Sequence, residues 1–519
     1  MTGHDQGHKY TEEQQRIISA ASAKTGSALV QAGAGCAKTS TGKTAMQRIK
    51  VPGLALAFNR KIADDLAKAM PRSFDARSFN ALGHRAWAGA LKTQPKLDDR
   101  KLGRIITQLA KGYKIELDSS QWSGAKRMVS LAQAAGLVPE SDRDGDQSLV
   151  PDSRDQWEEL GFQAGLSLDD CKMLWELGRS ALVENIKMAR AGVISFDDQI
   201  YCSSMLGGKF PKYPVIFVDE AQDLSPLNIK MLGQCMAQHA RVFAVGDENQ
   251  AIYAWRGASG TSMQDVRGLP AQNWSDYPLM TTFRCPKEVV KRQLWHVPEF
   301  RAWDESPDGL VVEWDEGWSW SQLQELIPQG AKEIAVICRN NAPIMSLALK
   351  LLRQGIGCFM LGRALGKGLI ALAKKIIASD DTPRDKCRGL IETWMVNEQS
   401  LAMANDREDR CETISDQGEA LLAVLEGAEC DDARGLQSVL FRVFARESGQ
   451  VCLSTIHRAK GLEWPLVMVL DSWRIPGKWA KKAAKAGNTV PLQQEWNLKY
   501  VAETRAQQTL VLASLEGFQ

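Results

Sequence analysis

The sequence lacks long apolar stretches and any excess of one charge, and each absence excludes a class of protein. No hydrophobic run approaches the ~18 residues that a membrane-spanning helix needs, and the N-terminal MTGHDQGHKY has no hydrophobic centre typical of a secretion signal. We therefore expect a cytoplasmic or nucleoid-associated protein that is not secreted and has no membrane partner. The 64 Lys and Arg residues nearly balance 62 Asp and Glu residues, so any site for a polyanion must be a local patch.

The cysteines and histidines also lack the close spacing that is typical of metal sites. The 11 cysteines show no CxxC spacing and only 6 histidines are present, so neither a zinc site nor a disulfide framework is indicated. We predict that the cysteines are buried, reduced thiols. The 519 residues are 44% hydrophobic and 24% charged, which is typical of a globular protein with several domains.

Short apolar runs that end in small or acidic residues predict buried strands. Helical-looking segments separate most of these runs, a pattern typical of parallel α/β sheets covered on both faces. The runs are 54–58, 215–218, 242–245, 334–338, 451–453, 466–470 and 509–513.

Two long stretches without strand-like runs interrupt this pattern, and they predict two α/β cores that each carry a mainly helical insertion. The first core is expected to comprise residues 1–87 and 189–284, with an insertion at 88–188. The second core is expected to comprise residues 285–367 and 446–519, with a smaller insertion at 368–445.

A turn rich in small residues follows the strand-like ALVQ. Backbone N–H groups of such a turn can surround phosphates, while a lysine neutralises the β/γ charge and a hydroxyl binds Mg²⁺. Lys38 and Thr39 suit these two roles, so the turn predicts a site for ATP and Mg²⁺. Its residues are Ala32, Gly33, Ala34, Gly35, Cys36, Ala37, Lys38, Thr39 and Ser40.

This turn departs from the usual GxxxxGK[ST] pattern, because Ala32 and Ala37 replace glycines. If the backbone at Ala37 is left-handed, alanine costs about 1–2 kcal/mol there. A second register, Ala37 to Thr44, supplies an unbroken GKT but begins five residues late. We favour the first register because phosphate-binding loops begin directly after their strand.

Acidic residues follow the strand in VIFVDEAQDLS. Asp219 would hold Mg²⁺, directly or through water, from the carboxyl edge of the sheet. Glu220 would orient and deprotonate the water that attacks the γ-phosphate. A solvated acidic turn is the alternative.

The next strand ends in VGDENQAIYAWRGA, which combines a phosphate sensor with flat aromatic side chains. Gln250 is suited to sensing the γ-phosphate and Arg256 to balancing its charge. Tyr253 and Trp255 are suited to stacking on nucleic-acid bases.

Taken in order, these motifs resemble those of superfamily 1A DNA helicases of the UvrD/Rep type. In the residues of each motif they are most similar to the F-box helicase branch of that family. The resemblance implies two RecA-like motor domains. TEEQ resembles the Q-motif, which implies that Gln14 recognises adenine; a helix capping box explains the same residues, and both can hold.

The resemblance also implies single-strand contacts on the first motor domain. FNRK supplies Phe58, Asn59 and Lys61, and SFNAL supplies Ser78, Phe79 and Asn80. Asn80 departs from the family pattern, in which histidine is common.

Three later motifs complete the resemblance. TFRCP implies that Phe283 stacks near adenine and that Arg284 reaches the γ-phosphate. STIHRAKGLEW implies DNA contacts from Thr455 and His457, and a contact of Glu463 with the sugar side of the nucleotide. NLKYVAETRAQ implies that Arg505 is an arginine finger acting in cis.

The resemblance implies an ATP-dependent translocase on single-stranded DNA that moves 3′-to-5′ and unwinds 3′-tailed duplexes. A nucleotide-gated DNA clamp with weak ATPase is one alternative, since Ala37 departs from the motif. Another is a motor subunit that needs a replication, repair, recombination, defence or nuclease partner. RNA as the substrate also stays open.

Overall fold

The computed structural model describes residues 10–23, 25–58, 60–143, 148–164, 166–252, 261–314, 317–404, 408–427, 430–446 and 448–518. Four of the predicted site residues, Asn59, Tyr253, Trp255 and Arg256, lie outside these ranges. The chain forms two compact units, Met1–Ala32 with Ala37–Leu279, and Gly33–Cys36 with Met280–Gln519.

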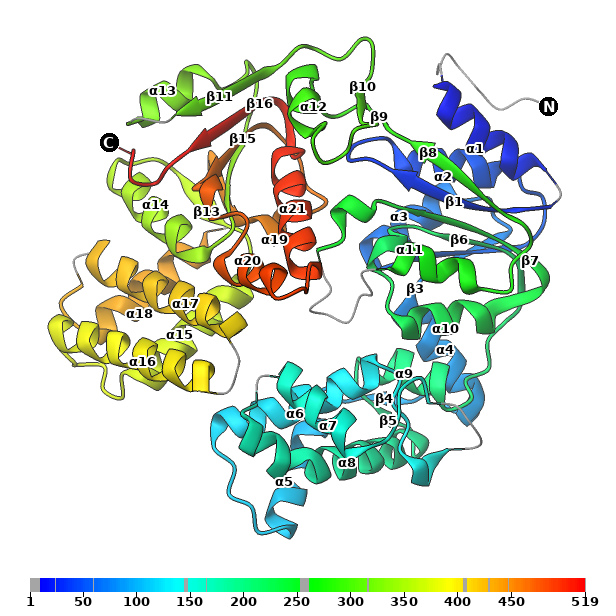
Figure 1. Cartoon of the computed structure of the whole chain (residues 1–519), viewed down its shortest axis with the longest axis horizontal. Helices are drawn as coiled ribbons and strands as arrows, with labels where there is room; N and C mark the ends of the chain where they lie inside the picture. Colours follow the sequence, from blue (N-terminus) through cyan, green and yellow to red (C-terminus); the bar gives the residue numbers. More distant parts are fainter. Residues whose placement is uncertain are drawn as a thin grey trace. The chain divides into compact units, whose positions relative to one another are not determined.

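A six-stranded parallel sheet forms the centre of the first unit, with the order β3-β2-β6-β7-β1-β8 (Figure 1). The apolar runs predicted at 215–218 and 242–245 lie in its strands, and the run at 54–58 does so except for Phe58, which follows β2; every residue of β2 is buried. The strands are β1 (Ser27–Ala32), β2 (Gly53–Ala57), β3 (Phe74–Ser78), β6 (Tyr213–Val218), β7 (Met236–Gly246) and β8 (Trp274–Leu279).

Local sequence signals set the starts of the helices that accompany this sheet. Thr11 caps the first helix in a capping box with Gln14, and Ser225 caps α10 in a second box with Asn228. The helices are α1 (Glu12–Ser22), α2 (Lys38–Gln47), α3 (Arg60–Ala69), α4 (Phe79–Leu91), α9 (Asp198–Met205), α10 (Pro226–Cys235), α11 (Ser262–Asp265) and the 3₁₀ turn η5 (Val266–Gly268).

The first insertion is mainly helical, and its apolar residues, such as Trp157 and Leu174, form one hydrophobic core with residues of α4, α9 and α10. No helix in the described part of the chain is apolar and long enough to cross a membrane. The insertion contains α5 (Lys101–Gly112), α6 (Ser119–Ala134), α7 (Arg154–Ala164), α8 (Leu168–Arg190), η1 (Glu140–Asp142) and the short paired strands β4 (Lys96–Leu97) and β5 (Val193–Ile194).

A buried ion pair joins this insertion to α9. The Lys101 ammonium lies 2.6 Å from the Asp198 carboxylate, and both side chains are fully buried. Burial alone would raise the pKa of Asp198, but Lys101 and the hydrogen bonds lower it overall. The side-chain amides of Gln133 and Asn185 each donate to the Asp198 carboxylate at 2.7 Å, so hydrogen bonds from the protein stabilise this buried charge.

The helices that flank the insertion in sequence, α4 and α9, pack side by side. Gly83 of α4 makes this close approach possible, because a Cβ there would lie 2.2 Å from the carbonyl oxygen of Gln199. The chain therefore enters and leaves the insertion at neighbouring positions of the first unit.

A second six-stranded parallel sheet forms the centre of the second unit, with the order β11-β16-β15-β12-β14-β13. The runs predicted at 334–338, 451–453, 466–470 and 509–513 all lie in its strands. The predicted α/β class, with two parallel sheets, is therefore confirmed. The strands are β11 (Leu310–Trp314), β12 (Ile334–Cys338), β13 (Cys358–Met360), β14 (Val451–Thr455), β15 (Trp464–Leu470) and β16 (Ala506–Ala513).

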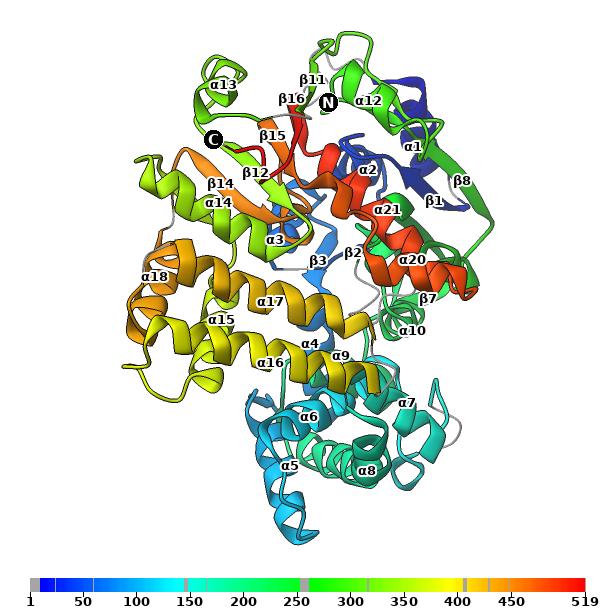
Figure 2. The ribbon, with the colours of Figure 1, turned by 60° about the vertical axis from the view of Figure 1, so that its left-hand side comes forward.

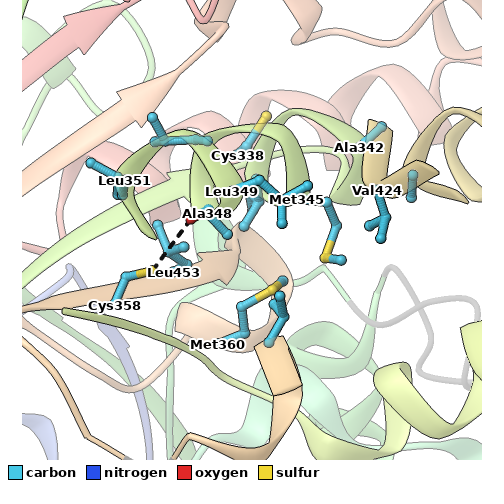
Figure 3. Packing of buried hydrophobic residues seen from close by; sticks show 14 of the residues in the cluster. Cys338, Ala342, Met345, Ala348, Leu349, Leu351, Cys358, Met360, Val424 and Leu453 are labelled. Carbon is cyan, nitrogen blue, oxygen red and sulfur yellow. Dashed lines mark hydrogen bonds between the residues drawn. The ribbon is translucent and has the colours of Figure 1, made fainter. Parts of the chain in front are cut away.

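Helix α14 packs its apolar face on this sheet, and Figure 3 shows Met345 and Leu349 of α14 among the core residues. All 11 cysteines are free and 10 of them are buried, as predicted. Burial raises the pKa of the Cys338 thiol to about 12. The helices are α12 (Lys287–Gln293), α13 (Trp320–Glu325), α14 (Asn341–Arg353), α19 (Ile456–Ala459), α20 (Lys478–Lys485), α21 (Val490–Glu503) and η6 (Ser472–Arg474), and the short strands β9 (Thr281–Thr282) and β10 (Arg301–Ala302) pair.

The second insertion is a small helical layer, in which α16 and α17 run side by side (Figure 2). Helix α17 also packs along α14, so this layer shares the hydrophobic core of the second sheet. Its helices are α15 (Arg363–Ile376), α16 (Arg384–Ala404), α17 (Glu408–Gly427) and α18 (Ala433–Ala445).

Charged hydrogen bonds join α17 to the end of β12 and to α21 within the second unit. The Arg339 guanidinium, at the end of β12, donates to Glu412 of α17 at 2.8 Å and to Glu495 of α21 at 2.8 Å and 2.9 Å. The two carboxylates accept in turn from the backbone N–H groups of Trp479 and Gly477, at the start of α20. One arginine thus holds three helices together.

Replacing Glu412 with glutamine should lower the free energy of unfolding by about 1 kcal/mol, because a hydrogen bond to a charged group is stronger than one to a neutral amide. Hydrogen exchange of the Trp479 amide would report this change locally. The matched control is Glu426→Gln on the same helix, where a half-exposed pair with Arg388 should contribute less than about 0.5 kcal/mol. Equal effects from both variants would contradict the prediction.

Candidate functional site

Three strand ends bring the predicted nucleotide-binding residues of the first unit together. Strands β6, β7 and β1 are neighbours in the sheet and run parallel, with Val218 opposite Ala244 and Gln31 opposite Gly246. The small-residue loop follows β1, Asp219 follows β6, and Asp247 follows β7. Their side chains therefore gather at one carboxyl edge of the sheet.

The first register of the phosphate-binding motif forms the loop. Helix α2 begins at Lys38, so the alternative register from Ala37 to Thr44 lies almost entirely in a helix and cannot form a loop. Ala37 has φ 58° and ψ 35°, a left-handed conformation that glycine adopts at little cost. The expected strain at this alanine is present.

Replacing Ala37 with glycine should therefore raise the free energy of unfolding by about 1 kcal/mol. Relief of the left-handed strain, about 1–2 kcal/mol, exceeds the entropy that glycine adds to the unfolded chain, about 0.4–1 kcal/mol. Urea denaturation of the full chain measures the difference. The control is Ala67→Gly in exposed, regular α3, which should instead destabilise by about 1 kcal/mol. The same sign for both variants would contradict the assignment.

The two predicted magnesium ligands contact each other. The Thr39 hydroxyl donates to Asp219 Oδ2 at 2.7 Å. Asp219 is 2% exposed, and burial together with the Glu220 charge raises its pKa to about 6. A hydroxyl beside a carboxylate is the oxygen donor set that Mg²⁺ prefers, with phosphates and water as further ligands, so these residues fit the ion. No cluster of three or more His, Cys, Asp or Glu residues that could hold a metal occurs among the described residues.

Glu220 is held by a residue that the motif reading missed. It has φ 55°, and its carboxylate accepts from the Gln222 amide at 2.5 Å. The carbonyl oxygen of that amide accepts from the backbone N–H of Asp247 at 2.9 Å. Gln222 is 1% exposed, so one buried amide ties Glu220 to the end of the neighbouring strand β7.

Lys38 and Gln250 meet at a second residue missed from the sequence, Asp247. The Lys38 ammonium lies 3.9 Å from Asp247 Oδ2, and the Gln250 amide donates to the same oxygen at 2.6 Å. Asp247 is fully buried; burial raises its pKa, while the Lys38 charge opposes that shift. Gln250 lies in the 3₁₀ turn η3 (Glu248–Gln250) that follows β7, as η2 (Ala221–Asp223) follows β6.

Gln14 forms the capping box that the sequence indicated. The side-chain oxygen Oε1 of Gln14 accepts from the Thr11 backbone N–H at 3.0 Å, and Thr11 Oγ1 accepts from the Gln14 backbone N–H at 3.2 Å. The Gln14 amide also donates to Thr41 of α2 at 3.1 Å. Recognition of adenine by Gln14 stays a prediction.

The tip of the phosphate-binding loop, Gly33–Cys36, belongs to the second unit. The Ala34 N–H donates to the hydroxyl of buried Tyr500 at 2.8 Å, and Thr282 donates to the Ala34 carbonyl at 2.7 Å. Gly35 has φ 71°, and a Cβ there would lie 2.4 Å from Cβ of Arg284. Tyr500 is a further site residue that the sequence reading did not assign.

Arg284 and Glu463 meet in the second unit, as their expected roles at one nucleotide require. The Arg284 guanidinium donates to the Glu463 carboxylate, which also accepts from Gln507 at 2.9 Å. Phe283 is 41% exposed, and its ring centroid lies 5.3 Å from that of Trp303. An exposed ring beside an arginine suits binding of a flat, anionic ligand.

Arg505 lies between α21 and β16 and is 1% exposed. Its guanidinium donates to the carbonyl oxygens of Val501 at 2.9 Å and Leu462 at 3.3 Å, and to the Thr504 hydroxyl at 3.3 Å. Neutral oxygens thus hold this cation, and none of these three partners is a carboxylate.

The predicted DNA contacts of the first unit include exposed and buried residues. Phe58 is 40% exposed and Lys61 is exposed on α3, whereas Phe79 is 2% exposed and lies in the core, 6.0 Å from the Phe58 ring. Phe79 therefore packs beside Phe58, and its contact with DNA stays a prediction. Ser78 caps α4 by accepting from the Ala81 N–H at 3.2 Å.

Asn80 contacts the backbone of an aromatic residue, Phe196, that the sequence did not indicate. Its side-chain amide donates to the Phe196 carbonyl at 3.1 Å, and the Phe196 ring is 58% exposed. In the second unit, Thr455 occupies the N-cap position of α19 without a capping hydrogen bond from its side chain, and His457 lies within the helix. Sequence alone gave no sign of Phe196, since it stands 116 residues from Asn80.

Comparison with known proteins finds a matching protein-family model for a segment of each unit. Residues 204–268 match the family model of the UvrD/REP helicase N-terminal domain, and residues 401–517 match that of the UvrD-like helicase C-terminal domain. F-box DNA helicase 1 of Gallus gallus is 23% identical over 540 residues, which cover 98% of this chain and 49% of that protein.

Two further relatives show the same pattern. F-box DNA helicase protein 1 of Schizosaccharomyces pombe is 23% identical over 505 residues, which cover 91% of this chain and 54% of that protein. ATP-dependent DNA helicase UvrD2 of Mycobacterium tuberculosis is 25% identical over 352 residues, which cover 58% and 47%. The chain spans about half the length of the curated relatives it matches.

The N-terminal model covers the strand ends with Asp219 and Gln250, and the C-terminal model covers Thr455 and Arg505. The resemblance noted from the ordered motifs is therefore confirmed by sequence profiles of both units, each built on a six-stranded parallel sheet. Segments of both units are thus similar to the N- and C-terminal domains of UvrD/Rep-type helicases.

Proposed function

We propose that the protein is an ATP-dependent DNA helicase that moves 3′-to-5′ on single-stranded DNA. One observation carries the proposal: Lys38, Thr39, Asp219, Glu220 and Gln250 gather at a single edge of the first sheet, each with a partner that orients it. These residue types supply what phosphoryl transfer from ATP to water requires.

Each residue has a separate task in hydrolysis. The N–H groups of the loop from Gly33 to Thr39 surround the phosphates, and Lys38 neutralises their charge. Thr39 and Asp219 hold Mg²⁺, which when bound neutralises charge between the β- and γ-phosphates. Glu220, oriented by Gln222, aligns the attacking water and accepts its proton.

The second unit contributes the remaining groups. Arg284 and Arg505 supply positive charge to the γ-phosphate when the two units close on ATP, and Phe283 stacks near adenine. Closure then couples hydrolysis to a change in the grip on DNA. Phe58, Lys61 and Asn80 contact the strand from the first unit, and Thr455 and His457 contact it from the second.

A strand-displacement assay tests this function directly. Substrates with a 3′ tail, a 5′ tail or blunt ends are incubated with and without ATP. We expect ATP-dependent displacement of the 3′-tailed duplex alone. Displacement of only the 5′-tailed duplex would overturn the polarity, and displacement without ATP would overturn the coupling to hydrolysis.

A nucleotide-gated DNA clamp is the second candidate, and the strained backbone at Ala37 favours it. DNA-stimulated phosphate release separates the two functions. Fast release supports the motor, whereas ATP binding without turnover supports the clamp. A motor subunit that depends on a repair or nuclease partner would hydrolyse ATP rapidly but displace no strand alone.

The fixed position of α17 on Arg339 supports a proposal about regulation. An insertion held in this way leaves the monomer less autoinhibited than helicases with a larger, separate second insertion. Single-turnover unwinding of a 3′-tailed duplex should then proceed with one bound protomer. A requirement for two or more protomers would contradict it.

A further inference from the structure

A cavity of about 530 Å³ lies in the first insertion, between α5 and α6. Its lining is basic and contains one large aromatic side chain. Four cations, Arg100, Arg104, Lys111 and Lys126, face it, against a single carboxylate, Asp99. A cavity of this charge suits an anionic ligand.

The aromatic residue, Trp122, is held in a fixed orientation. Its indole N–H donates to Thr107 at 3.0 Å, and Gly103 makes room for the ring, since a Cβ there would lie 2.8 Å from it. The Lys126 ammonium lies 5.9 Å from the ring centroid, at the outer limit of a cation–π contact. Trp122 is thus half-buried and oriented, with an ammonium close by.

The cations differ in how far they are already paired. Arg104 is bonded to Asp98, whereas the described part of the chain shows no side-chain ion pair for Arg100 or Lys111. Both of these side chains are exposed. They are therefore available to phosphate groups, which favour paired contacts with such cations.

Hydrogen bonds connect the cavity to the candidate DNA face of the first motor domain. The Asp99 carboxylate, in the cavity wall, accepts from the Phe196 N–H at 2.9 Å. The Phe196 carbonyl accepts in turn from Asn80 at 3.1 Å. Two hydrogen bonds therefore link the cavity wall at Asp99 to Phe196 and to Asn80.

We propose that this cavity binds single-stranded DNA that extends beyond Asn80 and Phe196, with a base on Trp122 and phosphates on Arg100, Lys111 and Lys126. The proposal rests on the proposed function, because it lengthens the strand's path on the same unit. An oriented indole surrounded by cations is the combination that binds single strands without regard to sequence.

Binding of short and long strands tests the proposal. Fluorescence anisotropy of the full chain is measured with oligothymidylates of about 8 and about 24 nucleotides, chosen to span typical site sizes. Trp122→Ala should weaken binding of the long strand on the order of 10-fold, and Trp122→Phe should retain most of the affinity. Binding of the short strand should not change.

A second variant avoids any packing defect at Trp122. The exposed double change Arg100→Gln with Lys111→Gln should also weaken the long strand, and should reduce its salt dependence by about 0.7 in log–log slope per lost phosphate contact. Lys187→Gln is the matched control, an exposed cation of the same insertion that does not line the cavity. It should bind both strands like the unmodified protein.

Three results would overturn the proposal: no change with the long strand, equal losses with both strands, or a loss confined to tailed duplex. The last result would identify the ligand as a duplex backbone. DNA-stimulated ATPase with the short strand distinguishes the two levels of inference. If the short strand stimulates ATP hydrolysis and the variants bind the long strand normally, only the cavity proposal fails. If neither strand binds and neither stimulates hydrolysis, the proposed function fails as well.

Discussion

Replacing Arg505 with alanine is expected to lower DNA-stimulated ATP hydrolysis by roughly 10³- to 10⁵-fold, the range measured for arginine fingers. The guanidinium would stabilise charge that develops on the transferring phosphoryl group, so its loss affects the transition state far more than the bound ground state. Lysine should not substitute, because an ammonium cannot make the contacts to Val501 and Leu462 that orient the guanidinium.

Single-turnover hydrolysis at saturating ATP measures the effect, and binding of a non-hydrolysable ATP analogue should stay nearly unchanged. Because Arg505 is buried, thermal unfolding must show that the variant is folded. Arg442→Ala, an exposed position on α18, is the control and should hydrolyse ATP normally. A folded Arg505→Ala protein that retained its turnover would show that the second unit does not complete the catalytic site.

Replacing Glu220 with glutamine should lower the hydrolysis rate by about 10²- to 10⁴-fold, because an amide cannot accept the proton of the attacking water. The change conserves shape, and the glutamine carbonyl can still accept from Gln222, so the local backbone should be preserved. Rapid-quench measurement of the chemical step gives the loss directly, while ATP binding should persist.

The control for this variant is Glu248→Gln, the same chemical change at an exposed acid after the neighbouring strand. It should have little effect on the rate. Normal turnover in Glu220→Gln would assign the base to another group at this edge, with Asp223 the next carboxylate after Glu220 in the chain. Loss of ATP binding would instead indicate that Glu220 is structural.

Seven strands were predictable from sequence because a buried parallel strand needs a continuous apolar run, and each of the seven runs carries this signal locally. Strands β3, β8 and β11 are partly exposed and carry no such run. The phosphate-binding loop was predictable for a similar reason, since its small residues and lysine stand side by side. The motif marked Ala37 as a position that is strained if its backbone is left-handed, and the structure supplies that conformation.

The supporting contacts were not predictable, because they join residues far apart in sequence. Arg339 contacts Glu412 and Glu495 across 73 and 156 residues, and nothing near Arg339 indicates either partner. Gln222 was visible within its motif, yet its bond to the end of β7 depends on the order of strands in the sheet. The burial of Phe79 was not predictable either, because a motif does not say which face of its helix is buried.

The close crossing of α4 and α9 at Gly83 bears on how this architecture tolerates change during evolution. A segment whose two ends are held together can grow, shrink or be exchanged with little entropic penalty to the host, since closing the loop is already accomplished by the crossing. The helical insertion can therefore vary in length with little effect on the folding of the sheet that carries it.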